Sequence, residues 1–232
     1  MTINGNRSEF LAEPERGTRE SAGTGVLLTC GVVAGPVYLV VGFAQAFLRP
    51  GFDPAHNDLS VLANGDLGWI QITNLIVTGL LTLLFAIGTR RALRGRAGGT
   101  WGPVLLGVYA VGLILAGVFV ADPMNGFPPG TPSGHPTSGS LHGLGHLVTG
   151  GLGFIGFIAG TFVLARCFRS TGRRRLGAFS IVTGVCFLAA FFGIATGSTS
   201  AAVVLSFTAA VVLAWVWIAV VAVVLRRLSV EP

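Results

Sequence analysis

The sequence predicts an all-α integral membrane protein, a bundle of six transmembrane helices. Two observations carry this prediction. The chain of 232 residues is 52% hydrophobic and only 10% charged, whereas a soluble domain carries about 25% charged residues. Its apolar residues also come in blocks of about twenty, the length of helix that crosses about 30 Å of hydrocarbon. Because backbone groups in lipid must be satisfied within their own segment, each block is expected to form a helix.

The apolar blocks lie near residues 25–48, 69–89, 101–121, 140–165, 177–197 and 201–225. Together they define one transmembrane domain, 25–228, and nothing between them is long enough to form a second domain. Residues 1–24 are polar, mix arginine with glutamate and lack a hydrophobic period. They are therefore expected to form a disordered cytoplasmic tail.

The basic residues are all arginines, and they cluster in alternate loops. The loops after the second and fourth blocks and the segment after the sixth hold Arg90, Arg91, Arg94, Arg96, Arg169, Arg173, Arg174, Arg175, Arg226 and Arg227. The loops after the first, third and fifth blocks hold one arginine, Arg49. The positive-inside rule therefore predicts a multi-pass protein of the plasma membrane with both termini in the cytoplasm. For the same reason the net charge of +6 indicates membrane lipid as the partner, and no nucleic acid.

This topology gathers polar side chains at the outer end of the bundle. The expected cluster comprises His56, Asp58, Ser60, Asn74, Asp122, His142 and His146. Asn74 joins it because it lies about one turn below the outer end of the second helix. Asp66 precedes that helix, where a carboxylate can accept bonds from free N–H groups, and is expected to cap it. We expect the cluster to shape the outer mouth of the bundle or to bind a lipid headgroup.

His142 and His146 also allow a sharper interpretation. Four residues apart, they share one face of a helix, where two imidazoles can ligate one divalent metal such as zinc. A carboxylate from Asp58 or Asp122 would complete the site. The pattern lacks the glutamate that follows the first histidine in HExxH proteases. Hydrogen bonds from the imidazoles to carbonyls or to an aspartate are the alternative.

The loop over residues 122–138 is expected to form an ordered lid. Its prolines restrict φ and lower the entropy lost on ordering; they are Pro123, Pro128, Pro129, Pro132 and Pro136. Met124 and Phe127 are the apolar residues of this loop that can dip back into the mouth of the bundle.

Three stretches resemble a known family: "HNDLSVLANGDLGWIQITNLIVTGLL" (56–81), "GVFVADPMNGFPPGTP" (117–132) and "GSLHGLGHL" (139–147). They are similar to the domain of unknown function 998, a family of bacterial and archaeal membrane proteins. The resemblance implies a multi-span bundle with an outer H-D-x-S-like element, a D-P-rich loop and a histidine that opens the fourth span. The matching residues are His56, Asp58, Ser60, Asp122, Pro123 and His142, with Asn57 as an extra residue in the first element. It implies an architecture and no reaction.

Three functions fit these observations, and whether the chain is an enzyme stays open. The first is a structural, regulatory or lipid-headgroup-binding membrane protein. The second is a metal-dependent hydrolase, similar to ceramidase-type enzymes, in which a zinc-bound water is the nucleophile. Its candidate residues are Ser60, Asp58, Asp122, His142 and His146. The third is a transporter for a small or lipid-like solute, against which the lack of charged residues in mid-span counts.

Overall fold

A computed structural model describes residues 12–136 and 138–230, all of them in helices, turns or loops apart from one isolated bridge. The helices are α2 (Ala12–Leu48), η1 (Leu59–Ala63, a 3₁₀ helix), α3 (Gly68–Ala92), α4 (Trp101–Val118), α5 (Leu141–Ser170), α6 (Arg174–Ala195) and α7 (Ala201–Val230). Six of them contain a stretch long and apolar enough to cross a membrane. The prediction of an all-α bundle with six spanning helices is confirmed.

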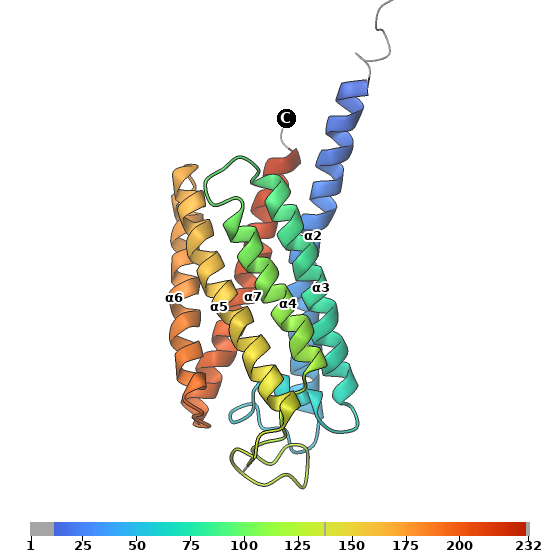
Figure 1. The fold of residues 1–232 in the computed structure, drawn as a ribbon, viewed down its shortest axis with the longest axis vertical. Helices are drawn as coiled ribbons and strands as arrows, with labels where there is room; N and C mark the ends of the chain where they lie inside the picture. Colours follow the sequence, from blue (N-terminus) through green and yellow to red (C-terminus); the bar gives the residue numbers. More distant parts are fainter. Residues whose placement is uncertain (1–11, 137, 231–232) are drawn as a thin grey trace, which may run out of the picture.

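The six long helices form a closed bundle in which each runs antiparallel to the next (Figure 1). Consecutive helices pack against one another, and α7 returns to pack against α2. The start of α2 and the C-terminal end of α7 lie at one end, which we call the arginine end (Figure 1). The opposite end, the loop end, is formed by residues 49–67, 119–140 and 196–200.

Several helices extend beyond their predicted limits. Helix α2 begins at Ala12, so residues 12–24, expected as a disordered tail, continue the first helix; residues 1–11 lie outside the described part. At the arginine end, α5 continues to Ser170 and α7 to Val230. The reason is that hydropathy marks where hydrocarbon ends, whereas alanine, glutamate and arginine are good helix formers that prolong a helix into water.

Glycines let α4 and α5 approach closely. A Cβ on Gly112 would lie 2.7 Å from the Cα of Gly153, and one on Gly156 would lie 2.9 Å from the carbonyl oxygen of Leu105. Such distances leave no room for any side chain, and small residues at helix contacts are how backbones come together in lipid. The α4–α5 contact is therefore closed along much of its length.

Aromatic side chains fill the centre of the bundle. Phe157 of α5 is fully buried, and its ring centroid lies 5.1 Å from Tyr109, 5.0 Å from Phe187 and 5.5 Å from Trp217. The indole nitrogen of Trp217 donates a hydrogen bond of 2.9 Å to Ser180 Oγ, so its polar atom is satisfied in the apolar core. This layer separates the arginine end from the space at the loop end.

Candidate functional site

A cavity of about 850 Å³ opens at the loop end of the bundle. All six long helices contribute to its walls, α3 through Leu75, and all three connections at that end contribute to its rim. Its deeper lining is apolar and largely aromatic, and includes Tyr38, Leu75, Tyr109, Leu113, Phe154, Phe191, Phe207 and Val211. The cavity is the place where the bundle can hold a ligand.

Polar residues gather at the rim of this cavity. From the predicted polar cluster the lining includes His56, Asp58, Ser60, Asp122 and His146, and it adds His135 and Ser140. The structure therefore brings five of the seven predicted residues to one cavity. His142 and Asn74 do not line it.

Asp58 is the least satisfied acid of the site. It stands at the start of η1 but makes no capping bond, and its Oδ1 is covered without a hydrogen bond from any described residue. Burial raises the pKa of Asp58 to about 6, and attraction to His135 opposes that rise only partly. A buried carboxylate without a partner is costly in a folded protein.

Asp122, in contrast, stabilises the start of α5 through hydrogen bonds. Its carboxylate accepts hydrogen bonds from the backbone nitrogen of Ser140 (2.9 Å) and from Ser140 Oγ (2.6 Å). Ser140 Oγ in turn accepts from the backbone nitrogen of Gly143 (2.9 Å), which is an N-cap. These bonds hold the pKa of Asp122 below its usual range. Position 143 needs glycine because a Cβ there would overlap the Asp122 carboxylate.

The two histidines of α5 lie in different environments. His146 Nδ1 lies 2.9 Å from the carbonyl oxygen of Phe119 and 3.1 Å from that of Ala116, so it donates to the free carbonyls at the end of α4. His142 is exposed, and its ring lies 6.0 Å from the Phe119 ring. Among the described residues no three His, Cys, Asp or Glu side chains are grouped to hold a metal ion. The zinc site stays a prediction.

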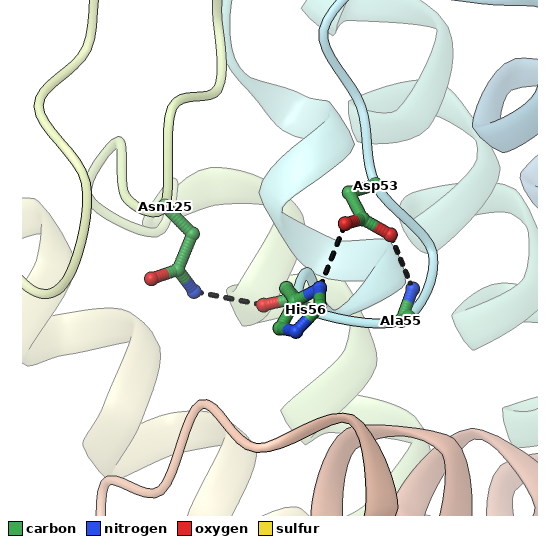
Figure 2. Close-up of polar contacts among 4 residues, drawn as sticks. All are labelled: Asp53, Ala55, His56 and Asn125. Carbon is green, nitrogen blue, oxygen red and sulfur yellow. Dashed lines mark hydrogen bonds and ion pairs between the residues drawn. The ribbon is translucent and has the colours of Figure 1, made fainter.

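The loop over residues 49–67 is folded on itself and tied to the loop that follows α4 (Figure 2). Asp53 accepts hydrogen bonds from the backbone nitrogen of Ala55 (2.9 Å) and from His56 Nδ1 (2.7 Å). These two bonds lower the pKa of Asp53, and the bond from Ala55 has the larger effect. Asn125 Nδ2 donates 2.8 Å to the His56 carbonyl, which joins the two loops across the rim (Figure 2).

Arg49 is a positioning residue that the sequence did not reveal. Its guanidinium donates to the carbonyl oxygens of Leu62 and Asn64, and it lies 4.8 Å from the centroid of the Phe127 ring. Asn64 Nδ2 donates 3.0 Å to the carbonyl of Ala121. One cation at the end of α2 thus contacts both the loop over residues 49–67 and the loop that follows α4.

The loop that follows α4, residues 119–136, folds back on the bundle. Phe127 is buried, 1% exposed, and its ring meets Phe52 edge-on at 5.2 Å; Met124 packs beside it against the core. These two residues dip into the mouth of the bundle as predicted. His135 Nε2 contacts the carbonyl of Gly197 at 2.6 Å, which links this loop to the connection between α6 and α7.

Two predictions at this end were wrong. Asp66 does not cap α3: Leu67 is the N-cap residue and no side chain bonds there, because Asp66 stands one position too early and is exposed. Asn74 does not meet the histidines. It is buried between α2 and α3, where its Nδ2 donates to the Tyr38 carbonyl and to Gln71 Oε1, both at 3.1 Å.

A closed bundle of six membrane-spanning helices with a cavity at one end defines a multi-pass membrane protein. Within that class, the chain belongs to the family described as protein of unknown function DUF998, whose model matches residues 32–224. No curated protein and no solved structure matches the chain. The match confirms the resemblance carried by residues 56–81, 117–132 and 139–147 and leaves the function to be argued from the cavity.

Proposed function

We propose that this chain binds an amphiphile, a lipid or a lipid-like molecule, in the cavity at the loop end. The observation that carries the proposal is the polarity of the cavity along its length. Titratable and hydroxyl side chains stand at the rim, whereas tyrosine and phenylalanine rings and aliphatic side chains form the deeper wall. A molecule with a polar head and an apolar tail matches this order, because each part then lies in the surroundings it prefers.

The cavity also has a route towards lipid. Leu144 and Leu147 of α5 line it, yet they are 57% and 71% exposed, so the wall formed by this half of α5 is open. In Figure 1, α5 diverges from α6 towards the loop end. An amphiphile in the membrane leaflet at that end can therefore enter from the side without leaving the hydrocarbon.

The size of the cavity supports a ligand of moderate size. Small-molecule sites enclose about 300–1,000 Å³, and this cavity, about 850 Å³, falls within that range. A single-chain amphiphile fits this volume better than a large two-chain phospholipid. The ligand would be held mainly by its chain, with the rim fixing its head.

Paired tryptophan variants of α5 test the proposal. Gly150 lines the cavity and a Cβ there meets nothing within 4 Å, so Gly150→Trp would fill the space. Leu152, two residues on, is 56% exposed and does not line the cavity, so Leu152→Trp is the matched control. We expect pyrene-labelled hexadecanol to bind the purified wild type and Leu152→Trp alike, and Gly150→Trp at least about tenfold more weakly. Equal binding by the two variants would contradict the proposal.

We further propose that the protein lies in the plasma membrane with the arginine end in the cytoplasm. The support is the charge asymmetry: arginines cluster in the connections at that end and at the end of α7. The cavity then faces the outer leaflet. Green fluorescent protein fused after Pro232 should fluoresce and alkaline phosphatase fused there should be inactive. The reverse pattern would overturn the orientation.

A metal-dependent hydrolase is the second candidate, because Asp58, Ser60, Asp122 and His146 share the cavity wall. This function requires zinc, whose bound water would attack a substrate held in the cavity. Elemental analysis of protein purified without chelators tests it. Near-stoichiometric zinc that is lost on His146→Ala would support the hydrolase, and metal-free wild type would remove it.

A further inference from the structure

The described side chains that line the cavity include acidic groups and imidazoles but no arginine. Its lining includes the carboxyl groups of Asp58 and Asp122 and the imidazoles of His56, His135 and His146, whereas no arginine stands among the described residues that line it. An anionic headgroup in such a place would face carboxylates with no guanidinium or ammonium group to neutralise it. Like charges close together in a partly buried site repel strongly.

The nearest basic side chain is already engaged. Arg49 is the one arginine in the connections of the loop end. Its guanidinium donates to the carbonyls of Leu62 and Asn64 and packs over the Phe127 ring, and it does not line the cavity. Recruiting it for a phosphate or carboxylate would release both loops, so it is not available to a ligand.

The two acids of the lining differ in what they can offer. Asp122 is committed to Ser140 and the start of α5. Asp58 has a covered oxygen that accepts no hydrogen bond from a described residue, although its residue lines the cavity. The carboxyl group of Asp58 thus belongs to a residue of the cavity wall, and no described residue donates a hydrogen bond to its covered Oδ1. A cationic donor from a ligand would stabilise the charge of this carboxylate.

Aromatic rings extend the same preference. Tyr38 of α2 and Tyr109 of α4 line the same cavity as Asp58. Both tyrosines line the cavity below the rim. The faces of tyrosine rings attract cations, so they favour an ammonium group next to Asp58 while remaining compatible with an alkyl chain.

We infer that the amphiphile bound by this cavity has a cationic, amine-bearing headgroup, and that Asp58 is the side chain that recognises it. This inference rests on the proposed function and names its ligand class. The amine N–H groups donate to the Asp58 carboxylate, the tyrosine rings flank the positive charge, and the chain runs along the phenylalanine-lined wall.

Photo-crosslinking with three matched probes tests the inference. Hexadecylamine, hexadecanol and hexadecyl sulfate, each with a diazirine in the chain, are added to the full-length protein in phosphatidylcholine vesicles, and labelling of cavity-lining peptides is measured. We expect the amine to label wild-type protein at least about tenfold more efficiently than the sulfate at equal membrane concentration. This comparison needs no variant, so it stands even if a substitution fails to fold.

Two variants then locate the cause. Asp58→Asn should bring labelling by the amine to within about twofold of the alcohol. Asp66→Asn removes the same charge from an exposed position away from the cavity and should leave the preference unchanged. Equal labelling by all three probes, preference for the sulfate, or an amine preference that survives Asp58→Asn would overturn the inference while the amphiphile site stands. Failure of every probe to label the cavity would overturn the proposed function itself.

Discussion

The two sides of α5 are built differently. Towards α4, Gly153 and Gly156 meet Gly112 and the Leu105 carbonyl at distances that exclude side chains, and the contact is closed. Towards α6, close contact is found at the arginine end, where a Cβ on Gly177 would lie 2.9 Å from the Ala165 carbonyl. Nearer the loop end that side opens, and Phe154, Phe191 and Ile194 line the cavity instead.

This difference shows how one helix can be both a structural and a ligand-facing element. Glycine at a helix contact removes the space into which a ligand could go. Towards α6, the rings of Phe154 and Phe191 meet edge-on at 5.5 Å, and both line the cavity. The two acids of the cavity also differ, in their hydrogen bonds. Both line the cavity, but Asp122 accepts hydrogen bonds from Ser140 at the start of α5, while the covered Oδ1 of Asp58 lacks a described donor.

Introducing a side chain into the closed contact should have the largest effect. Gly112→Leu would place a Cβ 2.7 Å from the Gly153 Cα and 2.9 Å from the Thr149 carbonyl, so backbones must separate. We expect a loss of about 3 kcal/mol or more in unfolding free energy. Gly150 also lies on α5, but it lines the cavity. Gly150→Ala should change the unfolding free energy by less than about 0.5 kcal/mol. Thermal unfolding in mild detergent measures both, and equal losses would contradict the comparison.

Neutralising Asp58 should stabilise the ligand-free protein. Because burial raises the folded-state pKa of Asp58 to about 6, above the unfolded value of about 3.9, ionisation opposes folding. The wild type therefore loses stability as pH rises through about 6. Asp58→Asn should gain up to about 3 kcal/mol at pH values near 8 and nothing near pH 4, where both proteins are neutral at this position.

The control for that experiment is Asp66→Asn, which removes the same charge from an exposed position. Melting temperatures measured across the pH range should run parallel for this variant and the wild type. If Asp58→Asn is destabilising at high pH, the carboxylate has a partner that stabilises its charge, and its role as an unsatisfied acceptor is wrong.

The histidines of α5 should differ in the same way as their surroundings. His146→Ala leaves the carbonyls of Ala116 and Phe119 without their donor, so we expect a loss of about 1–3 kcal/mol. His142→Ala removes an exposed ring that contacts Phe119 and should cost less than about 0.5 kcal/mol. Urea or thermal unfolding of the two variants side by side measures the difference. Similar losses would mean that the pair acts together after all.

The fold was accessible from the sequence because apolar blocks and arginine clusters report directly on the membrane. Topology alone also placed His56, Asp58, Ser60, Asp122 and His146 at one end, and all five line the cavity. The predicted role of Asp66 failed because capping depends on a single-residue register that periodicity does not define. Helix length failed at the ends because hydropathy does not mark where a helix stops.

The cavity itself could not be predicted. Its volume depends on the angle at which α5 leaves α6, and no local pattern encodes that angle. An arginine at the end of the first helix suggests pairing with an acid, and the actual contacts of Arg49 could not be predicted because they are backbone carbonyls in one loop and a ring from another. The spacing of His142 and His146 places them on one face of the helix. Only His146 donates a hydrogen bond to a carbonyl at the end of α4, whereas His142 makes a ring contact with Phe119.

The central claim is that the open side of α5 holds an amphiphile. Native mass spectrometry of the protein released from its own membranes in mild detergent tests it most directly. We expect one bound lipid-like molecule on the wild type and on Leu152→Trp, and none on Gly150→Trp, whose indole occupies the cavity. A wild type free of such a molecule, or a Gly150→Trp variant that retains the same one, would contradict the account.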